Sequence, residues 1–281
     1  MAISVDVAST VSNLTYFVPP ADGTAAYQYV NADPVTGKAP NNYTRNQYTV
    51  EVENVRGKED QYKLDEAGFQ FVQYPAKHKS FEDDEEIKTE YYAESVELLK
   101  SVTGASRVVI FDHTVRRNRP DQIDDGPQKR KPLPQVHIDQ TPKSADDRAH
   151  RHLPPADTPA LLQKRFQIVN VWRPINNPAW DWPLACCDYR SVDRKADPLP
   201  VKLIYPDMEG EFYGVTFSEV HKWKYLRGMT PEEAVLIKCY DSVADGSVSE
   251  YTPHTAFKDH SAPADAPFRE SIELRAFVFY D

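Results

Sequence analysis

The sequence predicts a mainly β protein, a sandwich or barrel with one or two helices ahead of most of its strands. Short segments rich in β-branched and aromatic residues recur through the second half of the chain, and turn-forming residues separate them. Hydrophobic residues make up 40% of the 281 residues, with 16 Tyr, 12 Phe and 4 Trp, which is enough for a sizeable core with aromatic-lined cavities. Because no repeat and no linker divides the second half, we expect a single domain over residues 1–281.

The first hundred residues predict two strands and one helix. Prolines interrupt residues 1–45, which are therefore expected to be extended and irregular. Residues 46–56 alternate polar and apolar side chains, and residues 68–74 form a second short pattern of the same kind; both are typical of strands. Residues 82–100 begin with acidic and end with basic side chains, which favours a helix because of the helix dipole.

The rest of the chain predicts mostly strands. We expect a charged, proline-rich loop over 113–134 and a polar loop or short helix over 143–158. A new strand is expected to start at His137, and the segments with the composition of strands are 107–112, 165–173, 183–188, 201–205, 211–217, 234–240 and 273–280.

His137 and Asp139 form the most informative motif of the chain. They are separated by one residue in a locally extended stretch, so their side chains point to the same side. An imidazole nitrogen and a carboxylate oxygen placed in this way can bind one metal ion. With a second histidine, three ligands would occupy one face of the ion, as in the 2-His-1-carboxylate sites of non-haem Fe(II) oxygenases. The open face would then accept O2 and a co-substrate.

The second histidine has to come from a distant part of the chain, and the candidates are His221, His254 and His260. His254 follows the predicted strand 234–240 and a polar turn, and Pro253 restricts the backbone just before it.

Arg269 and Ser271 lie where the last predicted strand opens and share one face of it by alternation. A guanidinium binds a carboxylate through two parallel hydrogen bonds, and a neighbouring hydroxyl adds a third donor. The pair therefore suits a dicarboxylate ligand.

Other reactive side chains have simpler interpretations. His150 and His152 lie in a charged segment and are expected to be solvated. The three cysteines, Cys186, Cys187 and Cys239, form no readable disulfide framework and are expected to be small buried hydrophobic residues in a reducing, cytoplasmic compartment.

The order H-x-D, His, R-x-S resembles the Fe(II)/2-oxoglutarate-dependent dioxygenases. Several short segments are similar, more closely, to the AsaB-like hydroxylase/desaturase family, which includes CmcJ-like and gibberellin desaturase-like proteins of fungal secondary metabolism. The resemblance covers roughly residues 60–281, and the segments that carry it are 136–141, 170–174, 183–188, 221–223, 238–242, 253–257 and 269–275.

This resemblance implies a double-stranded β-helix, a jelly roll of cupin type, with flanking helices. Residues 1–105 would form an N-terminal elaboration of strands and helix, and residues 106–281 the catalytic core. It also implies Fe(II), the co-substrate 2-oxoglutarate and O2, and an enzyme that hydroxylates or desaturates a small secondary-metabolite intermediate.

Carried onto matching positions, the resemblance implies that His137, Asp139 and His254 are the catalytic iron ligands. Arg269 would hold the distal carboxylate of 2-oxoglutarate, with Ser271 as a weaker assistant. The separation of Asp139 from His254 is longer than in the compact members of the wider superfamily, which keeps His221 as a competing ligand.

Four further residues are candidates for substrate binding. Asn170 and Trp172 lie on the face opposite Val171 and Arg173 if their strand is regular, and they are expected near the substrate pocket. Arg173 either binds a carboxylate of substrate or co-substrate or makes a structural ion pair, and His221 either orients the substrate or is a core histidine. Arg275 shares the face of Arg269, but we expect it to pair with Glu273.

Composition excludes some classes of partner. The net charge of −10 argues against nucleic acids and anionic membrane surfaces, and no apolar run has the length of a membrane span. The N-terminus lacks the pattern of a signal peptide. A small-molecule substrate is expected, and a homodimer stays open. The alternatives are a redox-neutral jelly-roll enzyme (isomerase, dehydratase or cyclase) and a non-catalytic β-sandwich binding protein.

Overall fold

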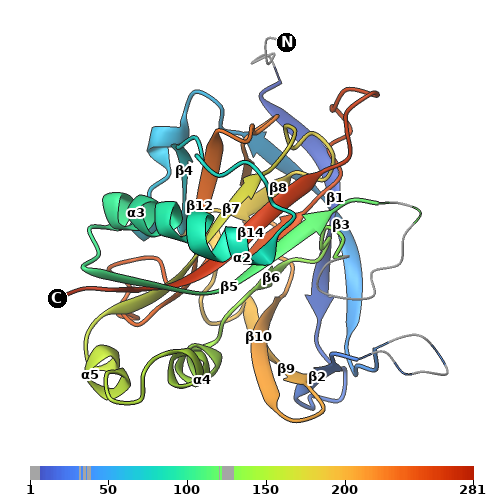
Figure 1. Cartoon of the computed structure of the whole chain (residues 1–281). Coiled ribbons are helices and arrows are strands. Elements are labelled where there is room, and N and C mark those ends of the chain that lie inside the picture. The colour runs from blue at the N-terminus through green and yellow to red at the C-terminus, as the bar shows by residue number, and fades with distance from the viewer. Residues whose placement is uncertain (1–6, 32, 34–35, 37–38, 120, 122–129) are drawn as a thin grey trace.

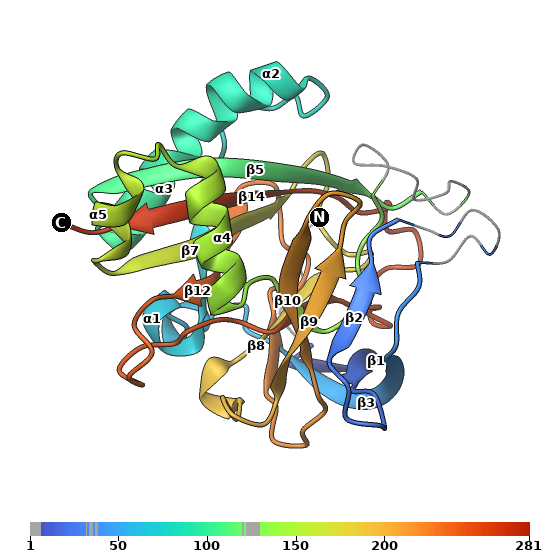
Figure 2. The same ribbon diagram turned by 90° about the horizontal axis from the view of Figure 1, so that it is seen from below.

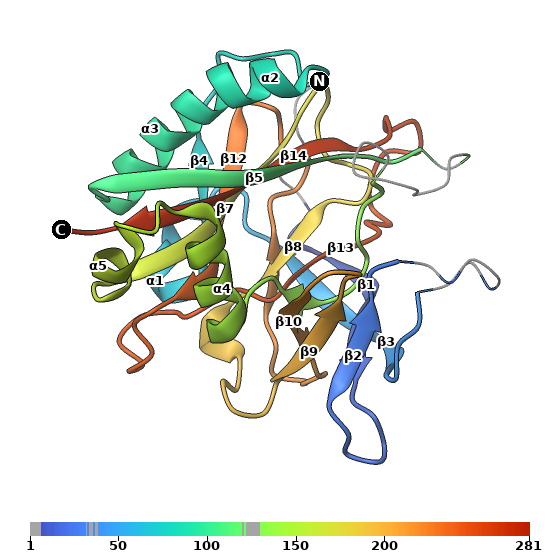
Figure 3. The same cartoon turned by 60° about the horizontal axis from the view of Figure 1, so that its bottom comes forward.

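Two β-sheets face each other in this computed structural model, which describes residues 7–31, 33, 36, 39–119, 121 and 130–281 (Figures 1 and 3). Neighbouring strands are antiparallel except for the pairs β3–β11 and β2–β9, which are parallel. Two facing, mostly antiparallel sheets are the arrangement of a jelly roll, so the mainly β prediction is confirmed.

The larger sheet has nine strands in the order β1-β3-β11-β8-β13-β6-β10-β9-β2. Their bounds are β1 (Ser9–Val18), β2 (Ala26–Tyr29), β3 (Thr44–Asn54), β6 (His137–Ile138), β8 (Leu184–Cys187), β9 (Pro198–Ile204), β10 (Glu209–Val215), β11 (Trp223–Tyr225) and β13 (His254–Ala256).

The smaller sheet has five strands in the order β4-β12-β7-β14-β5. Their bounds are β4 (Phe69–Gln73), β5 (Arg107–Arg117), β7 (Phe166–Pro174), β12 (Glu233–Asp241) and β14 (Glu270–Phe279). Every residue of β7 is buried, because this central strand is covered on both faces. Its inner face is turned to the nine-stranded sheet, and its outer face is covered by a helix.

That helix is the one predicted over 82–100. It consists of α2 (Asp84–Glu86), a π-helical turn (Ile87–Tyr91) and α3 (Tyr92–Thr103), and it lies across the five-stranded sheet in Figure 1. Asp83 caps its start by accepting hydrogen bonds from the backbone of residues 85 and 86. Leu98 and Leu99 pack with residues of β7, β12 and β14, which fixes the helix on the outer face.

Two more helices lie at one end of the sandwich, α4 (Pro142–His152) and α5 (Thr158–Leu162), as Figure 2 shows. Thr141 and Ser144 form a capping box at the start of α4. Short helical turns complete the chain at η1 (Glu59–Gln61), α1 (Leu64–Ala67) and η4 (Tyr189–Ser191). Within the described part of the chain, no helix is long and apolar enough to cross a membrane.

Two predictions about local structure were wrong in part. Residues 1–45 were expected to be irregular, but they contain β1 and β2, and β1 pairs with β3 over ten residues. The expected loop 113–134 begins with five strand residues, since β5 extends to Arg117; residues 120 and 122–129 lie outside the described part. For residues 143–158 the helical alternative is confirmed, since α4 covers them up to His152. The end of β5 was not recognised as a strand because its side chains are charged. In the structure Arg117 forms ion pairs there with Glu82 and Glu270.

The N-terminal hundred residues contribute to both sheets. β1 and β3 extend the nine-stranded sheet, and β4 pairs with β12 in the other one. The division of the chain at residue 105 into an elaboration and a catalytic core stays a prediction.

We predict that Gly68→Ala destabilises the fold by at least about 2 kcal/mol. Gly68 has a φ of 88°, which side chains avoid, and a β-carbon there would collide with Thr252 and lie 2.9 Å from the carbonyl oxygen of Tyr251. The matched control is Gly57→Ala, at φ 82° with nothing within 4 Å, which should cost only the backbone part of about 1–2 kcal/mol. Urea unfolding measures both, and equal losses would contradict the proposed collision.

Candidate metal centre

His137 and His254 stand opposite each other on neighbouring strands of the nine-stranded sheet. β6 and β13 are paired antiparallel at these two residues, so their side chains project from the same face. The centroids of the two imidazole rings are 4.4 Å apart. Segments more than a hundred residues apart in the chain thus bring two potential ligands together.

Asp139 completes the group from the end of β6. Its Oδ1 lies 3.2 Å from Nε2 of His137 and 3.9 Å from Nε2 of His254. One potential ligand atom from each of the three residues lies within 4.8 Å of the other two, the spacing that a single metal ion requires. The structure therefore brings together all three residues that the sequence singled out.

Backbone carbonyls orient both imidazole rings. Nδ1 of His137 lies 2.8 Å from the carbonyl oxygen of Gln135, and Nδ1 of His254 lies 3.0 Å from that of Thr252. In each case the acceptor is two residues earlier in the chain. Such a bond fixes the proton on Nδ1 and leaves the Nε2 lone pair free, the arrangement that metal-binding histidines need.

Two side chains of the five-stranded sheet hold Asp139. The side-chain amide of Asn170, on the inner face of β7, donates to Oδ2 at 2.7 Å, and Nε of Arg275 lies 3.7 Å from the same oxygen. Burial opposes ionisation of Asp139, but the hydrogen bond from His137 and the electrostatic effects of the neighbouring His254 and Arg275 hold the pKa of its carboxyl well below the usual range. The residue is thus a carboxylate, the form that binds metals.

The two histidines respond differently to burial. Burial opposes protonation of His137, but its pairing with Asp139 outweighs this and raises the pKa of the imidazole. Burial lowers the pKa of His254, and the neighbouring His137 lowers it further. His254 is therefore neutral at physiological pH, as a metal ligand must be.

Arg269 and Ser271 lie close by with unused hydrogen-bonding capacity. Nη1 of Arg269 donates to the carbonyl oxygen of Trp182 at 2.5 Å, while its Nε and the hydroxyl of Ser271 are buried without a partner in the described structure. Burial and the positive charge of Arg116 lower the pKa of the Arg269 guanidinium to about 9. A buried guanidinium of this kind lacks an anionic partner.

A narrow cavity of about 40 Å³ joins these residues. Its wall contains the three candidate ligands and Arg269, and it is completed by Arg116, Leu133, Trp172, Leu184, Thr255, Ala256, Glu273 and Arg275. The expected ion pair between Arg275 and Glu273 is confirmed. Trp172 faces the cavity, and the Arg269 guanidinium lies 5.6 Å from the centre of its indole ring.

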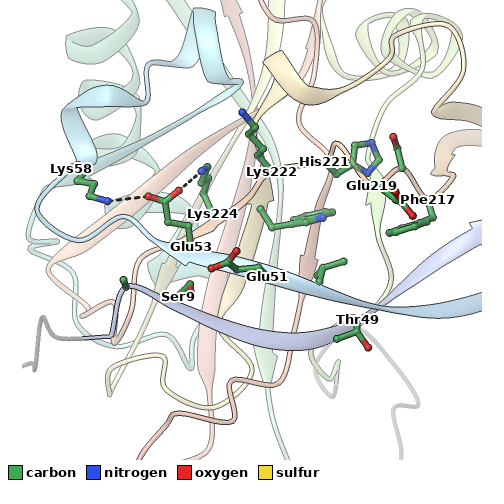
Figure 4. A pocket seen from close by; sticks show the side chains of 14 residues that line it. Ser9, Thr49, Glu51, Glu53, Lys58, Phe217, Glu219, His221, Lys222 and Lys224 are labelled. Atoms are coloured by element: carbon green, nitrogen blue, oxygen red, sulfur yellow. Dashed lines mark hydrogen bonds and ion pairs between the residues drawn. The ribbon is translucent and has the colours of Figure 1, made fainter.

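His221 lies elsewhere, in a larger surface pocket of about 800 Å³. Figure 4 shows its ring beside Phe217, with Glu53 bonded to two lysines in the same pocket. Nε2 of His221 is 2.9 Å from Asp197, and Nδ1 is 3.3 Å from the hydroxyl of Tyr16. Both ring nitrogens are engaged, which supports the interpretation of His221 as a core histidine and separates it from the candidate ligands.

Arg173 is also separated from the cavity. It follows Trp172 on β7 and therefore points to the outer, helix-covered face of the sheet. Its Nη1 donates to the carbonyl oxygens of Tyr74 and Pro231 at 2.9 and 3.3 Å. Arg173 is not part of the wall of the metal-centre cavity, and no ion pair of its guanidinium is seen among the described residues.

The remaining candidates behave as expected. His150, His152 and His260 are exposed. The three cysteines are buried and free, and burial raises the pKa of each thiol. What the sequence did not reveal is the support of Asp139 by Asn170 and Arg275 and the carbonyls that orient the rings. Alternation along β7 and β14 predicts on which face of its strand each of these side chains lies, but it does not predict which residues they contact.

Comparisons with known proteins agree with this geometry. A family model described as an oxidoreductase/YMDC permease-like domain matches residues 14–279. The hydroxylase/desaturase efuI of Hormonema carpetanum is 36% identical over 256 residues, which cover 84% of this chain and 85% of the relative. The Fe(II)/2-oxoglutarate-dependent dioxygenase nvfI of Aspergillus novofumigatus is 34% identical over 94% of both chains.

A solved structure, that of the iron and α-ketoglutarate-dependent endoperoxidase NvfI, superimposes with a TM-score of 0.84 at 32% identity and covers 97% of this chain and 98% of that one. The predicted jelly-roll fold and the predicted family are thereby confirmed. The chain belongs to the family of fungal hydroxylase/desaturases, and it is an Fe(II)/2-oxoglutarate-dependent dioxygenase that uses O2 and acts on a small molecule.

Proposed function

We propose that His137, Asp139 and His254 are the catalytic iron ligands of this dioxygenase and that Arg269 and Ser271 hold 2-oxoglutarate. The reaction is hydroxylation or desaturation of a small intermediate of secondary metabolism. The observation that carries the proposal is the convergence of three ligand atoms within 4.8 Å in a cavity that also contains the buried guanidinium of Arg269, whose Nε has no partner among the described residues.

The donor set fits iron. Two imidazole nitrogens and one carboxylate form the facial donor set that leaves further coordination positions open. Bound at this site, Fe(II) with 2-oxoglutarate and O2 supplies the oxidising power to break an unactivated C–H bond. Asn170 and Arg275 keep Asp139 in place while this happens.

The unused donors fit a carboxylate. Nε of Arg269 and the hydroxyl of Ser271 are buried without partners, and a buried polar group left unpaired costs about 1–3 kcal/mol. A carboxylate would satisfy both and would supply the missing counter-charge. Replacing Arg269 or Ser271 should therefore weaken the binding of 2-oxoglutarate more than the binding of iron.

The cavity wall has two further tasks. Leu133, Trp172, Leu184 and Ala256 line it with apolar surface, which excludes water from the oxidant and orients the substrate.

The finer points on partners remain proposals. We propose a cytoplasmic enzyme that binds neither nucleic acid nor membranes, on the basis of its net charge of −10. Light scattering of the purified protein tests the homodimer that the sequence left open. Stoichiometric succinate release separates the oxygenase from a redox-neutral enzyme, and binding of iron separates it from a non-catalytic protein.

We predict that His254→Ala abolishes iron-dependent turnover, because one of three ligands is lost. Anaerobic titration with Fe(II) and 2-oxoglutarate, followed by the charge-transfer band of the chelated keto acid, measures the site directly. His260→Ala is the matched control, since this nearby histidine is exposed and should leave the band unchanged. Normal succinate production by His254→Ala would remove the ligand assignment.

Arg269→Lys should raise the KM for 2-oxoglutarate by about 10- to 100-fold, because lysine keeps the charge but loses the two-pronged hydrogen bond. Iron affinity without co-substrate should change little. Arg151→Lys, on the exposed side of α4, serves as control. If the dependence on 2-oxoglutarate is unaltered, the anchor is another arginine of the cavity, Arg116 or Arg275.

Asn170→Ala should weaken Fe(II) binding about 10- to 100-fold, because Asp139 loses the donor that orients it. The measurement is the Fe(II) dissociation constant under anaerobic conditions. An unchanged constant together with a raised KM for the substrate would instead assign Asn170 to substrate binding, its role in the sequence-based prediction.

A further inference from the structure

Another cavity lies on the outer side of the five-stranded sheet, on the opposite face of β7 from the metal centre. Its volume is about 240 Å³, and it is bounded by the end of β7, the loop before α2 and Pro231. Arg173, His78 and Lys79 line it together with Asn176 and apolar groups. No aspartate or glutamate is among the described residues of its wall. The charged side chains of the wall are therefore basic, and one of them, His78, pairs through Nδ1 with Glu90 at 2.9 Å.

Arg173 is the deepest of these groups and is only 1% exposed. Nη1 is satisfied by two backbone carbonyls, but Nε has no partner and no carboxylate of the described chain pairs with the guanidinium. The guanidinium also lies over the ring of Tyr91, whose centre is 5.4 Å away, and close to the hydroxyl of the same residue. Burying a cation without a counter-ion is costly, so the site calls for an anion.

Unpaired polar atoms gather around this arginine. Nine buried side-chain atoms of the described residues lack a partner, and four of them belong to Arg173, His78, Tyr91 and Ser95. The rings of His78 and Tyr91 lie 6.3 Å apart, and Ser95 and Arg173 are both near enough to the Tyr91 hydroxyl to act against the rise in its pKa that burial causes. The orphaned groups therefore form one cluster.

The local backbone is also unusual. Tyr91 ends the π-helical turn Ile87–Tyr91, the widened turn that inserts an extra residue into the helix. Such turns occur often at functional sites because they displace a side chain from regular helical spacing. Here the turn places Tyr91 over Arg173, where it screens the guanidinium from the helix side.

We propose that this cavity binds a small oxyanion, a carboxylate or a phosphate, with Arg173 as its main anchor and the exposed Lys79 at its entrance. An ordered water could satisfy some of the orphaned atoms but would leave the buried charge uncompensated. An oxyanion supplies both the acceptors and the charge. The proposal concerns a separate face of the sheet and is independent of the ligands assigned to the metal centre.

The test is a titration of the purified enzyme with inorganic phosphate and, separately, with acetate and succinate, each compared with sodium chloride at equal ionic strength. Binding should raise the Tm by about 3 °C at a concentration ten times the Kd. Isothermal calorimetry gives the Kd. Stabilisation by phosphate alone identifies a phosphate site, and stabilisation by acetate and succinate that persists in Arg269→Lys identifies a carboxylate site in this cavity. No stabilisation beyond chloride by any of them overturns the proposal.

Three variants locate the bound anion. Lys79→Ala should weaken binding about threefold, and Arg173→Lys should weaken it at least about tenfold. Lys77→Ala is the matched control, because Lys77 is exposed in the same loop but does not line the cavity. Arg269→Lys should leave the binding unchanged. Full binding in Arg173→Lys or in Lys79→Ala places the anion elsewhere; Lys79, being exposed, keeps the test valid if Arg173→Lys does not fold.

Discussion

The metal centre depends on one contact between strands, the pairing of His137 with His254 across β6 and β13. These strands have only two and three residues, so neither could hold this register alone. Their outer neighbours hold it instead: β10 pairs with β6, and β8 pairs with all three residues of β13. A shift of one residue in either short strand would turn an imidazole to the other face of the sheet. The neighbouring strands β8 and β10 therefore fix the positions of the two histidines.

Charge balance explains why the opposite sheet is needed. The nine-stranded sheet supplies the candidate ligands, and the five-stranded sheet supplies groups that keep them in metal-binding form. Asn170 and Arg275 hold Asp139 from β7 and β14, and Glu273 in turn holds Arg275. The support is therefore built from strand residues, whose backbone positions are fixed by ladders on both sides, rather than from loops.

Sequence reasoning succeeded where a short-range rule decides the outcome. Alternation placed His137 beside Asp139 and predicted most strands, because side chains two apart always share a face. It could not decide which face of β7 looks inward, so Arg173 was associated with the pocket although its neighbour Trp172 is the residue that lines it. Among the three candidate histidines, His254 was assigned only through the resemblance to a family. The pairing of β6 with β13 produces no pattern in the sequence of either strand that would predict it.

The unpaired donors of Arg269 and Ser271 have a consequence for the end of the catalytic cycle. On the proposed assignment they hold the carboxylate of 2-oxoglutarate that is remote from the reacting carbon. Decarboxylation leaves that group untouched, so succinate presents the same end to the same donors. Arg269 and Ser271 therefore cannot discriminate between succinate and 2-oxoglutarate. The exchange of succinate for 2-oxoglutarate has to depend on the other end of each molecule, the end that lies at the iron.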